Sequence, residues 1–327
     1  MYNILSKIKS WYKLQLGERT SMKKDSTLFS YRTEILFIDD DPFFLKGLNE
    51  LLEDSYSIKA FTSPQEALDY INRKSQIESI LNPFIKYVNK DQADDEYKPR
   101  KATLESLYEN LYSRNNTLDA SVVFVDFNMQ EMNGIEFCKK ITNPHIQKVI
   151  MTAGMEEGRA LKAFNEGDID FFVSKKEEKF CDTLITAIEK MENRYFKNLS
   201  NKIAIKREID GNQVYQDEFT LFLKERKIVE YYAIDELGSC ICFDYSGKKH
   251  LFLCSSASAL NELVSIAETC DAEDLVIKGL QEKTHGVFLL TEIDKKKPVT
   301  DWTNYLHRIK GNFMVNGSQY YYASTEA

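Results

Sequence analysis

The stretch Glu34-Ile-Leu-Phe-Ile-Asp-Asp-Asp41 decides the fold of the N-terminal half of this chain. Its four consecutive apolar residues, without polar alternation, are typical of a strand buried on both faces of a parallel sheet. The three carboxylates that follow repel one another and lose hydration, so they require a cation or hydrogen-bond donors close by. Such sites are built at the C-terminal edge of an α/β sheet, which predicts further polar groups at later strand ends.

Three later apolar runs end in polar groups of this kind. Residues 121–126 end in Asp126, residues 148–152 end in Thr152, and residues 170–175 end in Lys175. Four strand ends therefore supply an acid pair, a single acid, a hydroxyl and a lysine, in that order. This arrangement resembles the CheY-like receiver domain of two-component response regulators. The resemblance implies an α/β fold with a doubly wound, five-stranded parallel sheet of the flavodoxin-like type.

The resemblance also implies a phosphoryl-transfer chemistry. Asp126 would accept a phosphoryl group, and a carboxylate can act as the nucleophile in such a transfer. The transition state spreads charge over three oxygens, so catalysis depends mainly on positioning and electrostatic stabilisation. Lys175 would pair with the acids and then with the phosphoryl oxygens. The Thr152 hydroxyl would hydrogen-bond the phosphoryl group, and Phe172 takes the position of the family's switch aromatic.

The same resemblance implies a Mg²⁺ cofactor. Asp40 would bind the ion directly and Asp39 mainly through water, while Asp126 and the backbone carbonyl of Asn128 would complete the protein ligands. Hard oxygen ligands with retained waters suit Mg²⁺. Asp41 is interpreted as an extra acid at a helix start, where the helix dipole favours negative charge.

Two positions depart from the family pattern. Met129-Gln130 stands where Met-Pro is usual, and Lys175-Lys176 stands where Lys-Pro is usual. The first change only removes a residue that stiffens a turn. The second leaves a choice of lysine, and the spacing from Gly167 favours Lys175. The competing hypothesis is a receiver that folds but is never phosphorylated, although no group of the site is missing.

Length and composition predict two domains without a membrane span. The 327 residues exceed one typical domain, and no apolar run approaches the ~20 residues that a span needs. No secretory signal is visible and the six cysteines lack a disulfide-framework spacing, so we expect a cytoplasmic protein. The formal net charge of −8 argues against a generally basic nucleic-acid-binding protein.

We expect four segments along the chain. They are an N-terminal amphipathic helix in residues 1–32, a receiver in 33–200 with a helical insertion at about 73–119, a helical linker in 201–212, and an α+β output domain in 213–327. The apolar stripe of the N-terminal helix is expected to dock on its own receiver or on a second subunit. The alternatives are reversible attachment to a membrane surface through its basic face, and disorder.

Two further apolar stripes lie in the insertion and after the receiver. Residues 104–112 carry leucines and tyrosines at helical spacing, and we expect this helix to pack on the side of the receiver. It would serve there as a dimer or partner surface, or simply enlarge the domain. The stripe that runs from Phe180 to Leu199 favours pairing with a partner helix in a homodimer. Residues 210–212 are expected to end this helix.

The output domain alternates helical and strand patterns without a clear catalytic motif. We expect a helix around Phe219, strands at 229–234, 239–243 and 250–254, a helix within 302–309 and a last strand at 319–322. Together with the N-terminal helix and the inserted receiver, this order resembles the LqsR-type quorum-sensing response regulators.

Three features of the output domain have both a functional and a structural interpretation. Gly238-Ser239 before Asp244 resembles part of a nucleotidyltransferase motif, without the expected acid pair on the next strand. Residues 320–322, all tyrosine, are either a base-stacking surface or an ordinary aromatic strand. The third feature is the group Cys240, Cys242, His250 and Cys254. It indicates either a zinc site of unusual spacing or a buried sheet face, and the second is far commoner.

The leading hypothesis is a non-enzymatic response regulator that accepts a phosphoryl group at Asp126 from a sensor histidine kinase or a phosphotransfer protein. Phosphorylation would draw Thr152 and Phe172 inward and change dimerisation or output contacts, thereby regulating gene expression or physiology. The alternatives are a receiver-controlled enzyme, an output domain that binds nucleotide or nucleic acid, and a protein-interaction adaptor.

Overall fold

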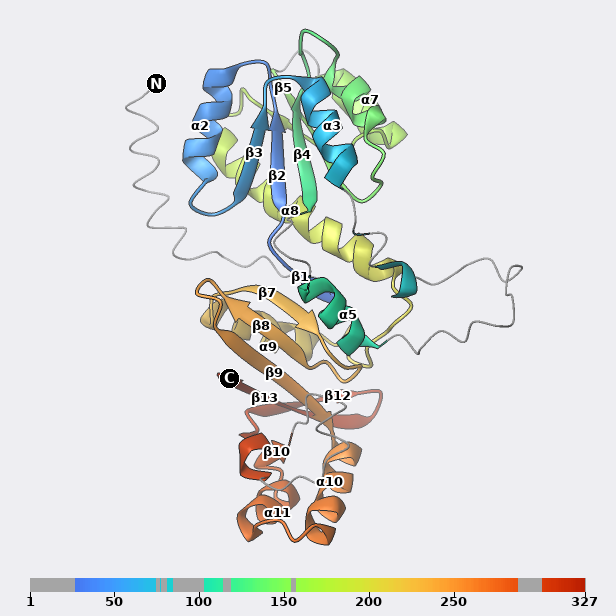
Figure 1. Ribbon diagram of the computed structural model, residues 1–327, viewed down its shortest axis with the longest axis vertical. Helices are drawn as coiled ribbons and strands as arrows, with labels where there is room; N and C mark the ends of the chain where they lie inside the picture. Colours follow the sequence, from blue (N-terminus) through green and yellow to red (C-terminus); the bar gives the residue numbers. More distant parts are fainter. Residues whose placement is uncertain are drawn as a thin grey trace, which may run out of the picture. The chain divides into compact units, whose positions relative to one another are not determined.

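The computed structural model describes residues 27–74, 77, 81–84, 103–113, 119–153, 157–287 and 302–326 (Figure 1). The expected N-terminal amphipathic helix lies outside these residues. The described chain divides into two compact units. The receiver unit takes its residues from Arg32–Ile80 and Asn116–Asn201, and the output unit takes its residues from Lys23–Tyr31, Leu81–Asn115 and Lys202–Ala327.

The receiver unit contains the expected five-stranded, doubly wound parallel sheet. Its strand order is β3-β2-β4-β5-β6, and every neighbouring pair is parallel. The prediction from the apolar runs is therefore confirmed. The strands are β2 (Glu34–Ile38), β3 (Ser57–Phe61), β4 (Ala120–Asp126), β5 (Gln147–Thr152) and β6 (Phe171–Ser174).

Helices cover both faces of this sheet because its strands are apolar on both sides. The face that carries Phe37 and Phe124 packs against α2 and α8, and the face that carries Ile38 and Val125 packs against α3, α6 and α7. The helices are α2 (Pro42–Leu52), α3 (Pro64–Lys74), α6 (Gly134–Lys140), α7 (Glu157–Glu166) and α8 (Phe180–Lys202).

The output unit is built on a second, entirely antiparallel sheet. Its six strands lie in the order β1-β7-β8-β9-β13-β12, and each neighbouring pair is antiparallel. An α+β output fold was expected, but the β12–β13 hairpin was not. The strands are β1 (Phe29–Ser30), β7 (Ile228–Ala233), β8 (Cys240–Asp244), β9 (Lys249–Ser256), β12 (Gly311–Val315) and β13 (Ser318–Glu326).

One face of the output sheet packs against α9 (Gln213–Glu225) through aromatic rings. Phe252 on β9 lies 5.1 Å from Phe219 and 5.3 Å from Phe222, measured between ring centroids. Tyr215, one turn earlier on α9, is edge-on to the same phenylalanine at 5.8 Å. Ring pairs prefer edge-to-face and offset arrangements at such separations, so these contacts stabilise the packing of α9 on the sheet beyond the burial of apolar surface.

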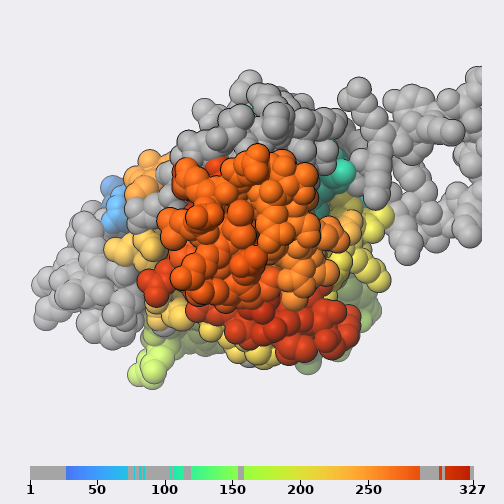
Figure 2. Space-filling model, turned by 90° about the horizontal axis from the view of Figure 1, so that it is seen from below, coloured from blue at the N-terminus to red at the C-terminus, as the bar shows by residue number. Residues whose placement is uncertain are grey.

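A smaller lobe follows β9 in the output unit. It consists of α10 (Ala257–Thr269), α11 (Asp274–Gln281) and a two-stranded pair formed by β10 (His285–Val287) and β11 (Leu306–Arg308). Leu260, Val276 and Leu280 form its core together with Trp302. Figure 2 looks onto this lobe, where the orange helices lie beside the red C-terminal strands.

Two segments belong to the output unit although they flank receiver strands in sequence. β1 pairs with β7, and α5 (Leu104–Tyr112) lies beside β7 (Figure 1). The expectation that this inserted helix packs on the receiver is wrong. The physical reason is that five helices already cover both faces of the receiver sheet, whereas the output sheet has an apolar face that α9 does not cover.

Three other expectations need correction. Helix α8 ends at Lys202 rather than near Gly211, and its residues Leu184, Ile188 and Met191 are buried in the receiver core. These three residues are therefore not a free seam for a partner helix. Residues 302–309, expected as a helix, form a 3₁₀ turn at Trp302–Tyr305 followed by β11.

Candidate functional site

The acids, the hydroxyl and the lysine meet at the C-terminal edge of the receiver sheet. Parallel pairing aligns Ile38 with Val125, Asp126 with Met151, and Thr152 with Ser174. The residues that end or follow these strands therefore lie at one edge. Asp41 accepts hydrogen bonds from the N–H groups of Phe43 and Phe44 and so begins α2 as its N-cap. The interpretation of this acid as a helix-start residue is confirmed.

Lys175 joins the two buried carboxylates. Its Nζ donates to Asp39 Oδ2 at 2.6 Å and forms a second, short bond to Asp126 Oδ1. Burial by itself lowers the pKa of Lys175, but the hydrogen bonds and charges of Asp126 and Asp39 outweigh burial and raise that pKa. Lys175 is therefore a cation held between two carboxylates. Of the two neighbouring lysines, Lys175 is the one that contacts these acids.

Asp39 is the most buried acid of the site, with 2% of its surface exposed, whereas Asp40 beside it is exposed. Burial raises the pKa of Asp39, although the hydrogen bonds from Lys175 and from the Asp41 N–H act in the opposite direction. A desolvated carboxylate beside a second one favours any cation that reaches it.

Asp126 is 8% exposed and is oriented by the backbone that follows it. Its Oδ2 accepts the N–H of Asn128 at 2.8 Å, while its Oδ1 faces Lys175. Gly134, which the sequence pattern did not single out, begins α6 directly against this loop. A Cβ at Gly134 would lie 2.5 Å from the Asp126 carbonyl oxygen and 2.8 Å from Ile150 Cδ1.

A Gly134→Ala substitution is expected to disturb both stability and the position of Asp126. The added methyl group meets backbone that has no room to move, and overpacking of this kind costs about 1–3 kcal/mol. Urea denaturation and the rate of labelling by acetyl phosphate would measure the two effects. Gly47→Ala in α2 is the matched control, because nothing lies within 4 Å of its Cβ position. Stability and labelling of Gly134→Ala equal to those of the control would contradict this close-approach argument.

Thr152 and Phe172 lie next to this edge in different environments. The Thr152 side chain is fully buried, and its hydroxyl has no hydrogen-bond partner among the described residues. Phe172 is half-buried and packs at the margin of the core on the α7 side of the sheet. The structure thus places a buried, unengaged hydroxyl and a partly exposed aromatic ring beside the acids.

Phe44 of α2 contacts Lys175, a role that the helical pattern alone did not reveal. The Lys175 Nζ lies 4.4 Å from the centroid of the Phe44 ring, and that ring packs against Phe180 at 6.0 Å. An ammonium group over a ring face is attracted by the ring quadrupole. The ring and the two carboxylates therefore restrict the lysine from different sides.

A Phe44→Leu substitution is expected to slow phosphorylation by acetyl phosphate roughly two- to fivefold. A cation–π contact contributes about 0.5–1 kcal/mol where one side is solvent-accessible, and this converts to such a rate factor. Phe44→Tyr keeps the ring face and should restore the rate. The neighbouring Phe43→Leu is the control, because the Phe43 side chain is 85% exposed. Equal rates for Phe44→Leu and Phe43→Leu would refute the contact's role.

The oxygen atoms at this edge suit a small, hard cation. Both carboxylate oxygens of Asp39 and of Asp126 accept one hydrogen bond each and keep a further lone pair, and the exposed Asp40 adds a third carboxylate. Lys175 lies between two of the acids. Within the described part of the chain, no three His, Cys, Asp or Glu side chains form a preassembled metal cluster. The donor set fits Mg²⁺ with several retained waters.

The cysteine and histidine cluster of the output sheet has the character of a core. Cys240, Cys242 and Cys254 are fully buried, and burial raises the pKa of the Cys240 thiol to about 12. His250 donates through Nε2 to the carboxylate oxygen Oδ2 of Asp244 at 2.9 Å. Among the described residues, no three His, Cys, Asp or Glu side chains are grouped so that they could hold a metal ion, which favours the structural interpretation here.

Two other output features are also engaged in the fold. The Ser239 hydroxyl accepts the Cys254 N–H at 2.9 Å, and Ser239 is 2% exposed, so it is not placed for nucleotidyl transfer. Tyr320 and Tyr321 are buried, and the Tyr322 hydroxyl donates to Glu218 at 2.7 Å. These rings are not an open stacking surface for bases.

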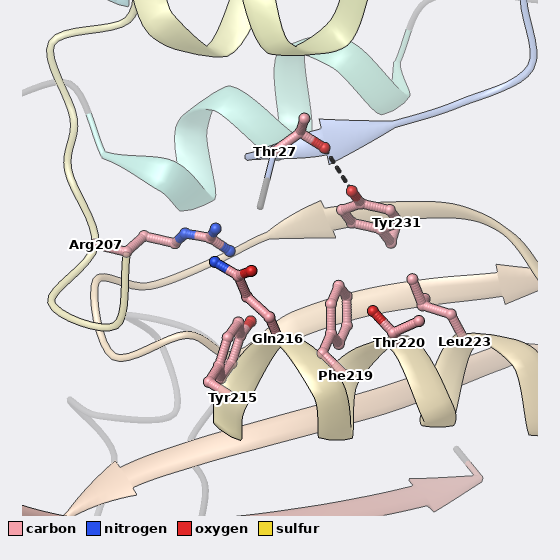
Figure 3. A pocket seen from close by; sticks show the side chains of 8 residues that line it. All are labelled: Thr27, Arg207, Tyr215, Gln216, Phe219, Thr220, Leu223 and Tyr231. Carbon is pink, nitrogen blue, oxygen red and sulfur yellow. Dashed lines mark hydrogen bonds between the residues drawn. The ribbon is translucent and has the colours of Figure 1, made fainter. Parts of the chain in front are cut away.

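Arg207 is one of the eight residues that line a small pocket in the output unit (Figure 3). The Arg207 side chain donates to Asp210 Oδ1 through Nε at 3.1 Å and Nη2 at 3.0 Å, and Figure 3 shows Thr27 bonded to Tyr231 beside it. The guanidinium is thus already held by a carboxylate. Among the described helices, none has the length and apolar character to cross a membrane.

The chain is similar over nearly its whole length to one solved response regulator. The structure of LqsR from Legionella pneumophila matches with a TM-score of 0.72 and 22% sequence identity, covering 93% of this chain and 90% of that one. At this identity the match shows a shared fold. It bears out the resemblance inferred from the sequence.

Two other solved structures match about half of the chain. A CheY-like receiver protein from Methanospirillum hungatei JF-1 has 17% identity and a TM-score of 0.33, covering 51% of this chain and 98% of that one. A structure titled adenylate cyclase from Rhodopirellula baltica has 19% identity and a TM-score of 0.34, covering 52% and 94%. These scores are too low to carry an argument about activity. No protein-family model and no curated protein matches the chain.

Proposed function

We propose that this protein is a phosphorylated response regulator in which Asp126 accepts a phosphoryl group from a sensor histidine kinase or a phosphotransfer protein. The observation that carries the proposal is Lys175 bonded to both Asp39 and Asp126 at the carboxyl edge of a doubly wound sheet. A lysine that neutralises two buried acids there is ready to follow the charge onto an incoming phosphoryl group.

The transfer can be written from these residues. A carboxylate oxygen of Asp126 attacks phosphorus, an O–P bond forms, and the P–N bond to the donor imidazole breaks. Lys175 then bonds a phosphoryl oxygen, and the buried Thr152 hydroxyl donates to another. Mg²⁺ bound by Asp39, Asp40, Asp126 and the Asn128 carbonyl would neutralise charge on the phosphoryl oxygens.

The switch proposal follows from the unengaged hydroxyl. Movement of Thr152 toward the phosphoryl group vacates space beside β5, and the half-buried Phe172 ring can turn inward to fill it. The resulting change would alter dimerisation or the contacts of the output unit, and through them gene expression or physiology. We infer that the output unit is not catalytic. The Ser239 side chain is buried and its hydroxyl accepts the Cys254 N–H, and Tyr320 and Tyr321 on β13 are buried in the unit.

Phosphorylation is expected to require a divalent cation. Incubation with acetyl phosphate or phosphoramidate and Mg²⁺ should add one phosphoryl group per chain, detected by intact-protein mass spectrometry. Chelation with EDTA should abolish the added mass, because the acids repel the anionic donor when the ion is removed. Equal labelling with and without Mg²⁺ would overturn the assigned metal role, and no labelling under either condition would favour a receiver that only folds.

A further inference from the structure

The helix α5 rests on the face of the output sheet that α9 leaves uncovered. Tyr108 packs against a cluster on that face made by Ile241, Leu251, Leu253 and Ala323. Its ring meets Tyr232 edge-on, with centroids 5.3 Å apart and planes at 60°. One turn later, Tyr112 stacks on Phe243 at 5.1 Å with the planes 10° apart. Two aromatic side chains at positions i and i+4 therefore anchor the helix.

The other sides of α5 are those of an amphipathic helix. Leu104, Leu107 and Leu111 are buried, whereas Glu109 and Asn110 are exposed. A helix of nine residues is not stable alone in water, so docking has to supply most of its stability. Local help comes from a capping box between Thr103 and Ser106. This is the pattern of an amphipathic helix bound through its apolar side to an apolar surface.

The contact is only partly closed. Tyr112 remains 52% exposed while it stacks, and the Phe243 ring beneath it is half-buried. The chain also connects α5 to the phosphoacceptor strand, since residues 113–119 join Tyr112 to β4, which ends at Asp126. The carbonyl of Asp119 in that connection accepts the N–H of Glu34 at the start of β2.

We propose that the sheet face formed by Tyr232, Ile241, Phe243, Leu251 and Leu253 is a docking surface for an amphipathic helix of a partner protein, and that α5 is its internal occupant. The partner helix presents two aromatic side chains one turn apart on its apolar face, because that is the chemistry with which α5 fills the surface. A tethered helix competes at high effective concentration, so a partner gains access when α5 is loosened. Loosening by phosphorylation of Asp126 is the part that rests on the proposed function.

A helical peptide tests the surface directly. The probe is a fluorescein-labelled peptide of residues 103–113, held helical by a lactam between Glu109 and a lysine introduced as Ser113→Lys on its exposed side. A full-length Tyr108→Ala/Tyr112→Ala variant, whose own α5 has lost its anchors, is expected to bind this peptide at least tenfold more tightly than the wild-type chain. The peptide carrying both tyrosine-to-alanine changes is the matched negative probe. A Glu109→Ala/Asn110→Ala chain should behave as wild type.

Several outcomes overturn the docking surface. One is a folded variant, with native circular dichroism, that binds neither peptide or binds both equally. If the double variant does not fold, Tyr112→Ala alone, at the half-exposed position, replaces it and should bind the peptide several-fold more tightly than wild type. If Tyr112→Ala binds the peptide no more tightly than the wild-type chain, the docking surface is likewise overturned.

A second arm tests control by the receiver. Beryllofluoride with Mg²⁺, whose adduct is followed by fluorine NMR, is expected to raise peptide affinity of the wild-type chain and to lower hydrogen-exchange protection of α5. If the adduct forms but neither change is seen, phosphorylation does not loosen α5. The docking surface itself is then judged by the peptide experiment alone. Failure to form an adduct counts against the proposed function instead, so the two failures are distinguishable.

Discussion

An Asp126→Asn variant is expected to show no phosphoryl labelling by acetyl phosphate or phosphoramidate under conditions that label the wild-type chain. The amide is nearly isosteric with the carboxylate but is not nucleophilic toward phosphorus. The fold should survive, because an amide oxygen can still accept the Asn128 N–H and Lys175 keeps its 2.6 Å bond to Asp39. Intact-protein mass spectrometry measures the labelling, and circular dichroism verifies the fold.

The control for this experiment is another carboxylate on the receiver surface. Asp168 pairs with Lys139 at 2.9 Å, outside the strand-end site, so Asp168→Asn should be labelled like the wild-type chain. Labelling of Asp126→Asn at the wild-type stoichiometry would remove Asp126 as the acceptor. The site would then be reassigned by peptide mapping of the modified residue.

The second large effect is expected on the fold of the output unit. A fragment of residues 202–327 should fail to fold cooperatively, because it lacks β1 and α5. Leu28, just before β1, and Phe29, the first residue of β1, are both buried. The Leu28 carbonyl also accepts the N–H of Ala233 on β7. Two side chains of this size contribute about 3–6 kcal/mol by burial, which is comparable with the whole stability of many domains.

Loss of α5 adds to this cost. Without Tyr108, the cluster of Ile241, Leu251 and Leu253 is open to water. Near-ultraviolet circular dichroism and amide NMR dispersion report whether the fragment folds. Fusing residues 27–31 and 103–113 back through flexible linkers should restore a cooperative transition. A fragment that unfolds cooperatively without these segments would show that the output unit is self-sufficient. If the fragment does not fold without these segments, binding tests for nucleic acid require the full chain.

Much of the receiver site could be predicted from order and spacing. A buried parallel strand has an unmistakable apolar run, and polar residues at its carboxyl end have to meet those of its neighbours. Asp39, Asp126, Thr152 and Lys175 come together for that reason. Phe44 and Gly134 were missed as site residues because their roles depend on distances between elements. A helical stripe does not reveal which of its members lies beneath a lysine.

The output unit was less predictable because its pieces are far apart in sequence. Periodicity correctly predicted a helix at 104–112, but an apolar stripe carries no information about which sheet it covers. The 3₁₀ turn at Trp302 followed by β11 shows the same limit, since pairing with β10 outweighs local helical spacing. Antiparallel pairing also recruited the two-residue β1, which is too short to be recognised in the sequence.

The three acids after Ile38, together with the later strand ends, are enough to determine a doubly wound receiver with an acidic edge, because strand burial and charge repulsion act on neighbouring residues. Only the tertiary structure decided that Asp41 caps α2 while Asp39 meets Lys175, and that β1 and α5 complete the output sheet. Those outcomes depend on which apolar faces remain uncovered after the local elements have formed. This is a property of the assembled chain rather than of any one segment.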